Sequence, residues 1–210
     1  MGLRYVSYLC YSLCSIHVII PCLYNSFISS FSLFCTRKKA PHPFENSIFA
    51  TSGDDKTVRM WHIGGKQCIA ITESEALPDM SRALVFEPTT GDWLVAGLGG
   101  RLGVRKVSNM GQHAGTIVTF MGKNLKKCAS LKVAKEQVSD MAFSSNGKTL
   151  AVASNDQFIY LLHVNGPTDM NKYAKCGGHS SYVTDVSISE NNKWMMTNDG
   201  KLSLLFFFFH

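Results

Sequence analysis

The stretch "TSGDDKTVRMWH", Thr51 to His62, carries the strongest fold signal in the sequence. Asp55, in a run typical of a tight turn, stands six residues before Trp61, which lies in the next apolar segment. A carboxylate held in a turn accepts hydrogen bonds, and an indole N–H is a donor that can satisfy it when both groups are buried. The stretch therefore predicts two strands joined by a tight turn and tied together by a buried polar network.

Short apolar segments separated by Gly, Asn, Asp and Ser follow one another from about residue 41. This rhythm is typical of an all-β protein, and no sustained helical period competes with it. The segment "VSDMAFSSNGKTLAVASND" (138–156) aligns with "VTDVSISENNKWMMTNDG" (183–200), and "SRALVFEPTTGDWLVAGLGG" (81–100) has the same order of strand, turn and strand. Four-stranded repeats with a period of about 40–45 residues are typical of WD40-type β-propeller blades.

The opening stretch resembles the end of a WD repeat, in which a buried network joins the His of a Gly-His pair, a Ser or Thr, the turn Asp and the Trp. By position, Thr51, Asp55 and Trp61 match the last three members, and His179 belongs to a Gly-His pair in the last copy. The resemblance implies that these four residues are structural, although a His, a hydroxyl and an Asp also invite a catalytic interpretation.

The run "KCGGHSSYVTDVSISENNKWMMTNDG" (175–200), with the two copies before it, resembles the echinoderm microtubule-associated protein-like (EML) family, and the second propeller of that family more than the first. The resemblance covers about residues 41–200, or three to three and a half four-stranded blades. It implies an incomplete WD40-type β-propeller without enzymatic activity that binds tubulin and microtubules in the cytoplasm and serves cytoskeletal organisation. No short motif marks the residues that contact tubulin.

Positive charge is concentrated in one part of the chain, whose formal net charge is +6. Arg101, Arg105 and Lys106 precede a loop-like segment with five lysines: Lys123, Lys126, Lys127, Lys132 and Lys135. One interpretation is a solvated basic loop. The other is contact with an acidic surface, either a phosphate backbone or a carboxylate-rich protein tail.

Residues 1–40 form an apolar, Cys-rich leader with no charged side chain from Tyr5 to Cys35. They are long enough to span a bilayer, although Ser, Asn25 and Pro21 dilute the run, and they fit a signal peptide less well. If they insert, the Arg37-Lys38-Lys39 cluster would keep the rest of the chain cytoplasmic. A third interpretation is that a mistaken first exon encodes them.

The apolar tail, residues 201–210, contains "LLFFFF", which supplies aromatic residues for a last strand but also resembles a translated pyrimidine-rich intron. Both ends thus suggest coding sequence that was read past its exon borders. An open arc of about three blades exposes sheet faces and edges, so we expect that the chain alone is not a stable soluble monomer.

Enzymatic sites find little support. The glycines of the run 97–100 lack the Lys-Ser/Thr of a P-loop and are explained by a tight turn, while Asp54 and Asp55 are adjacent and point different ways. The histidines are isolated, and the cysteines form neither a zinc pattern nor a disulfide framework. We therefore expect no catalytic residues, no metal and no cofactor.

Two alternatives to microtubule binding stay open. One is a WD40 scaffold or adaptor for protein complexes of unrelated purpose, because the propeller fold does not fix function. The other is a membrane-anchored propeller that uses residues 5–35. The expected partners are tubulin and other proteins rather than nucleic acid, and a membrane only if residues 1–40 are an anchor.

Overall fold

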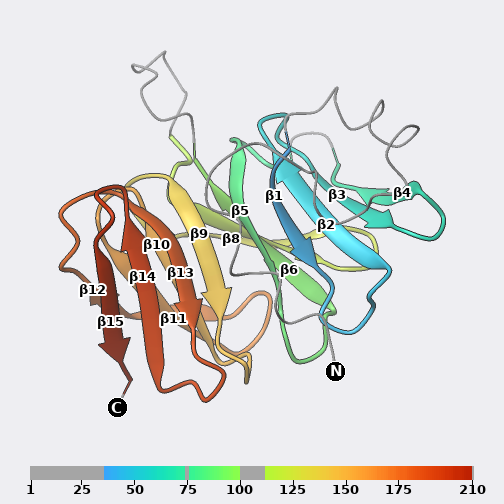
Figure 1. The fold of residues 1–210 in the computed structure, drawn as a ribbon. Helices are drawn as coiled ribbons and strands as arrows, with labels where there is room; N and C mark the ends of the chain where they lie inside the picture. Colours follow the sequence, from blue (N-terminus) through green and yellow to red (C-terminus); the bar gives the residue numbers. More distant parts are fainter. Residues whose placement is uncertain (1–35, 74–75, 100–111, 210) are drawn as a thin grey trace. The chain divides into compact units, whose positions relative to one another are not determined.

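The computed structural model describes residues 36–73, 76–99 and 112–209. These residues form antiparallel β-sheets and contain no helix (Figure 1). The all-β fold expected from the sequence is confirmed.

Each sheet is a simple meander in which strands that follow one another in the chain pair side by side. The first sheet contains β1 (Thr36–Pro41), β2 (Ile48–Gly53), β3 (Val58–His62) and β4 (Gln67–Ile71). The second contains β5 (Ser81–Phe86), β6 (Trp93–Leu98), β7 (Thr116–Met121) and β8 (Lys127–Lys132). The third contains β9 (Val138–Phe143), β10 (Thr149–Ser154), β11 (Ile159–Val164) and β12 (Met170–Cys176). The fourth contains β13 (Val183–Ile188), β14 (Trp194–Asp199) and β15 (Leu204–Phe208).

The first strand of every sheet lies on the inside, because β1 packs against β5, β5 against β9 and β9 against β13 (Figure 1). The described residues thus form a row of four sheets that is open rather than closed. The expected incomplete β-propeller is confirmed, with three four-stranded blades and a three-stranded fourth.

Packing between sheets explains why the central strands read as continuous apolar runs. All six residues of β6 are buried, since Leu94 and Leu98 face the core shared with the first sheet while Trp93 and Val95 face the core shared with the third. A strand that is covered on both faces needs apolar side chains at every position rather than at alternate ones. A separate core joins the third and fourth sheets around Ile159, among others.

The position of Gly97 differs from the expected tight turn, because this residue lies inside β6. A Cβ atom at Gly97 would lie 2.5 Å from Cγ1 of Val138, on the neighbouring inner strand β9. The glycine therefore allows the second and third sheets to approach closely, and it does not serve a turn.

The sheets extend past both expected limits of the propeller. β1 begins at Thr36, before the expected start at residue 41, and β15 uses Leu204–Phe208 of the expected tail. Residues 1–35 lie outside the described part of the chain. No helix that could cross a membrane is found among the described residues.

Candidate functional site

The polar residues of the opening stretch divide into two groups. The indole Nε1 of Trp61 donates a hydrogen bond of 2.9 Å to Oγ1 of Thr51, across the β2–β3 pair. Asp55 instead caps its own turn, where it accepts bonds from the amide and hydroxyl of Thr57, and it pairs with Arg59 at 2.6 Å. The structure thus brings Thr51 and Trp61 together and leaves Asp55 at the turn.

His179 lies in the fourth sheet and belongs to a separate buried set. Its Nε2 is 2.7 Å from Oγ1 of Thr197, and its Nδ1 is 3.2 Å from Oδ2 of Asp199. All three residues are buried. Sequence reasoning missed Thr197 and Asp199, although the turn "TNDG" that contains them was one basis of the family resemblance.

The carboxylate of Asp199 is held by a ring of donors. Burial by itself raises the pKa of Asp199, but the amides of Ser203 and Lys201 and the ring of His179 bond to the carboxylate and outweigh burial, so that its pKa is lowered. A carboxylate that accepts several hydrogen bonds keeps its charge even when water is excluded. The set is therefore a satisfied internal network.

The two polar sets occupy equivalent places in their sheets. In the first sheet, Ser52 pairs with Val58 and closes a turn in which Lys56 has a positive φ of 60°. In the fourth sheet, Asn198 pairs with Leu204 and closes a turn in which Leu202 has a positive φ of 64°. Thr197 is thus the counterpart of Thr51, and Phe207 is the counterpart of Trp61. The first sheet keeps the hydroxyl–indole half of the WD network, and the fourth sheet keeps the imidazole–hydroxyl half.

A third version of the network stands in the third sheet, where Leu162 occupies the place of the Trp. The hydroxyl of Tyr160 donates to Oδ2 of Asp156 at 2.7 Å, and the amide of Lys135 donates to the same oxygen at 3.0 Å. Burial, followed by the nearby carboxylate, raises the pKa of Tyr160, so that the phenol stays protonated. A tyrosine two residues before the expected Trp therefore supplies the donor.

The five lysines of the basic segment do not all lie in a loop. Lys127 and Lys132 are the first and last residues of β8, the outer strand of the second sheet, and the other three lie in the connections on either side. All five are exposed. Lysines on an edge strand also hinder pairing with foreign strands, which is a structural reason for their presence. Arg101, Arg105 and Lys106 lie outside the described residues.

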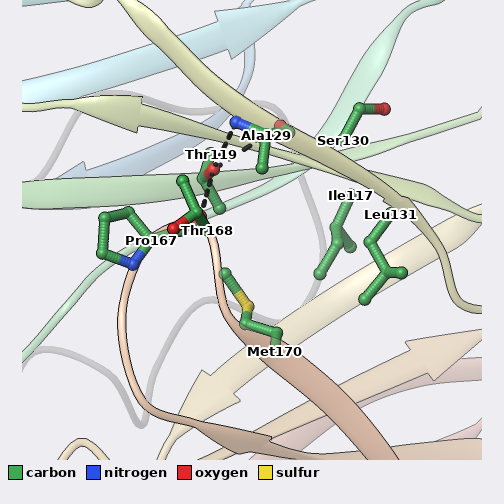
Figure 2. Close-up of a pocket in the computed structure, with 8 residues that line it drawn as sticks. All are labelled: Ile117, Thr119, Ala129, Ser130, Leu131, Pro167, Thr168 and Met170. Atoms are coloured by element: carbon green, nitrogen blue, oxygen red, sulfur yellow. Dashed lines mark hydrogen bonds between the residues drawn. The ribbon is translucent and has the colours of Figure 1, made fainter.

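A small cavity of about 80 Å³ lies next to β8. Figure 2 shows it between β7, β8 and the segment that leads into β12, with Thr119 donating to the carbonyl of Pro167 at 2.7 Å and accepting from the amide of Ala129 at 3.0 Å. Sites for small molecules usually enclose roughly 300–1,000 Å³. This cavity is a packing gap that is too small for such a ligand.

A charged cluster lies where the inner strands β1 and β5 begin. Asp54, in the β2–β3 turn, accepts a bond of 2.6 Å from Nη2 of Arg37 and lies 3.2 Å from Nη2 of Arg82. One carboxylate is therefore shared by two guanidinium groups that come from different sheets.

A second ion pair joins the first sheet to the third. Nζ of Lys38 on β1 lies 2.5 Å from Oδ1 of Asp140 on β9. Burial raises the pKa of Asp140 to about 6; Lys38 opposes this shift, and the neighbouring Asp185 adds to it. The ion pairs Lys38–Asp140 and Arg82–Asp54 thus link different sheets.

Within the described ranges, no three His, Cys, Asp or Glu side chains gather in a way that could hold a metal ion. Cys68, Cys128 and Cys176 are free thiols, and burial raises the pKa of Cys176. Such a thiol stays protonated and unreactive.

A family model described as "Echinoderm microtubule-associated protein second beta-propeller" matches residues 40–210. The chain is 30% identical over 169 residues to Echinoderm microtubule-associated protein-like 4 of Xenopus laevis, a match that covers 80% of this chain and 16% of that protein. It is 31% identical over 170 residues to the Homo sapiens protein of the same name, covering 80% and 15%. It is 27% identical over 168 residues to Echinoderm microtubule-associated protein-like 2 of Homo sapiens, covering 80% and 23%. The chain therefore spans less than a quarter of these relatives.

Proposed function

The chain belongs to the echinoderm microtubule-associated protein-like family, and from this premise we propose that it is a non-enzymatic WD-repeat protein that binds tubulin and associates with microtubules in the cytoplasm. The observation that carries the proposal is the match of residues 40–210 to the second propeller of the family, together with the row of meander sheets. The names of these relatives describe them as microtubule-associated or similar to such proteins.

The absence of catalysis is proposed because the polar residues that resemble a catalytic set are buried. Asp199, His179 and Thr197 form a hydrogen-bonded series of carboxylate, imidazole and hydroxyl, as in hydrolase triads. However, the side chains of His179 and Asp199 are fully buried, and Thr197 is 1% exposed. A nucleophile must reach its substrate, so this set supports a role in holding the fourth sheet together.

The contact with tubulin is proposed at the lysines on and beside β8. These five side chains are exposed and carry the same sign of charge, and tubulin has acidic surfaces. Attraction between such surfaces is screened by ions, with a Debye length of about 8 Å at physiological salt. Binding through this surface should therefore weaken as salt rises.

Microtubule co-sedimentation tests the proposal with two charge-matched variants. The first replaces Lys123, Lys126, Lys127, Lys132 and Lys135 with Glu, and we expect at least a fivefold loss of apparent affinity. The second makes the same change at five exposed lysines elsewhere: Lys56, Lys66, Lys148, Lys193 and Lys201. We expect that this control keeps most of the binding, because its changes lie away from β8.

The outcomes separate the function from the contact. Equal losses in both variants would show that only total charge matters, and unchanged binding of the first variant would exclude the β8 contact. If the unaltered chain stayed in the supernatant at all tubulin concentrations, microtubule binding itself would be wrong for this chain. A WD40 scaffold for other protein complexes would then be the better interpretation.

A further inference from the structure

A second cavity, of about 230 Å³, lies beside the inner strands β1, β5, β9 and β13. Its lining comes from all four sheets, with Arg37 on β1, Arg82 on β5, Ser139 on β9 and Tyr182 just before β13. Gln137, Asn155 and Thr184 add further polar side chains to the lining. This volume is below the usual range for small-molecule sites but is large enough for one or two side chains.

The lining is rich in hydrogen-bond donors that lack acceptors. Nε of Arg82 and Oγ of Ser139 are buried and have no hydrogen-bond partner among the described residues. Buried polar groups are almost always paired, so two such donors around one cavity call for an explanation. An acceptor that enters the cavity would provide one.

Two guanidinium groups line the cavity on one side. Arg37 and Arg82 both lie within ion-pair distance of the carboxylate of Asp54, and Nε of Arg82 points to no acceptor among the described residues. Asp140, on the same inner strand as Ser139, is already paired with Lys38. Guanidinium groups match a carboxylate with two parallel hydrogen bonds, a geometry that favours Arg over Lys at such sites.

We propose that this cavity binds the carboxylate side chain of an acidic segment of a partner protein, with Arg82 as its main contact and Asp54 as its internal competitor. The acidic side chain would enter the cavity and pair with the guanidinium of Arg82. This surface differs from the lysines on and beside β8, so the inference does not depend on microtubule binding.

The probe is a fluorescein-labelled peptide of eight glutamates, with binding followed by fluorescence anisotropy, and an octalysine peptide as the negative control. Arg82→Gln should weaken binding of the glutamate peptide at least tenfold. The matched control is Arg59→Gln, which removes the same charge at a residue that pairs with Asp55 in its own hairpin and does not line the cavity. This control should stay within twofold of the unaltered chain.

A loss of binding in Arg82→Gln could also follow from misfolding. A second variant, which should bind the glutamate peptide more tightly, therefore provides the decisive test. Asp54→Asn removes the competing carboxylate from both arginines and should tighten binding of the glutamate peptide at least threefold. Unchanged or weaker binding in a folded Asp54→Asn variant, checked by far-UV circular dichroism, would overturn the proposal.

The β8 variant distinguishes this site from the proposed microtubule contact. If the five Lys→Glu changes abolish peptide binding while Arg82→Gln does not, acidic segments bind at the lysines and the cavity assignment is wrong. If Arg82→Gln loses the peptide but still co-sediments with microtubules, the cavity is confirmed as a separate site.

Discussion

At the scale of single residues, the WD network is divided among sheets instead of being repeated whole. The first sheet keeps Trp61 on Thr51, and the fourth keeps His179 between Thr197 and Asp199. Where a Phe replaces the Trp, as at residue 207, no indole N–H exists, and the imidazole bonds to the hydroxyl and the carboxylate instead. In these two sheets the remaining members of the network therefore pair with one another.

His179→Ala is expected to lower the thermal midpoint Tm of the chain by at least about 4 °C, because it leaves buried hydrogen-bonding groups without partners. Differential scanning fluorimetry measures the change. His113→Ala removes an exposed imidazole and should leave Tm within about 1 °C. Equal midpoints for the two variants would contradict the structural role of His179.

Asp140 couples the stability of the fold to pH. Its folded-state pKa, about 6, lies above the ordinary value of 3.8, so the folded chain binds this proton more tightly than the unfolded chain does. The stability that the folded chain gains from this tighter proton binding is fully present below pH 3.8 and is lost as pH rises through about 6.

Asp140→Asn removes this titration. The difference in Tm, variant minus unaltered chain, should therefore become more positive from pH 4 to pH 7. Thermal melts at one-unit steps test this trend, with the exposed Asp92→Asn as the control. A difference that stays constant or falls over this range would show that the carboxyl of Asp140 is not protonated more easily in the folded chain.

At the scale of elements, β6 shows how closely neighbouring sheets approach. Its side chains point alternately into the core shared with the first sheet and the core shared with the third. Gly97 provides the space that the inner strand β9 occupies. Val138 is fully buried against this glycine, so the contact has no room to relax into solvent.

Gly97→Ala should destabilise the chain by roughly 1–3 kcal/mol, the usual cost of an extra methyl group in a well-packed core. Gly166→Ala is a matched control, since a Cβ there meets no atom within 4 Å. Urea denaturation followed by tryptophan fluorescence measures both. Similar midpoints would mean that the second and third sheets do not pack as closely as the structure shows.

At the scale of the whole molecule, the same kind of interface recurs between successive sheets, and the fourth sheet has one face that no described residue covers. Leu204, Phe206 and Phe208 of β15 are 50%, 53% and 72% exposed, while Phe207 packs toward the third sheet. Exposed aromatic side chains on one sheet face are a site for association.

We expect the isolated 210-residue chain to self-associate, with a sedimentation coefficient that rises with concentration. Phe206→Ser combined with Phe208→Ser should shift the population toward the monomer, because it removes apolar surface from this face. Phe44→Ser changes a side chain that is 60% exposed in the β1–β2 turn and should have little effect. A single monomeric species for the unaltered chain at all concentrations would contradict the prediction.

Much of the fold could be predicted from local sequence. Turn residues, alternating apolar positions and the repeated order of strand, turn and strand are local properties, and they specify meander sheets of the kind observed. The pairing of Thr51 with Trp61 also follows from the spacing within one hairpin. Thr197 could have been found from the same spacing once "TNDG" was compared with "TSGDDKT", whereas Asp199 falls at the place of Gly53 and not at that of Asp55.

The sequence by itself determined the all-β class, the blade repeat and the family, because each depends on residues that lie close together in the chain. Only the tertiary structure decided that Gly97 serves the packing of two sheets, that Lys38 reaches Asp140, and that Arg37 and Arg82 share Asp54. These contacts join different sheets, and their geometry depends on how the inner strands pack. No local pattern of residues encodes that packing.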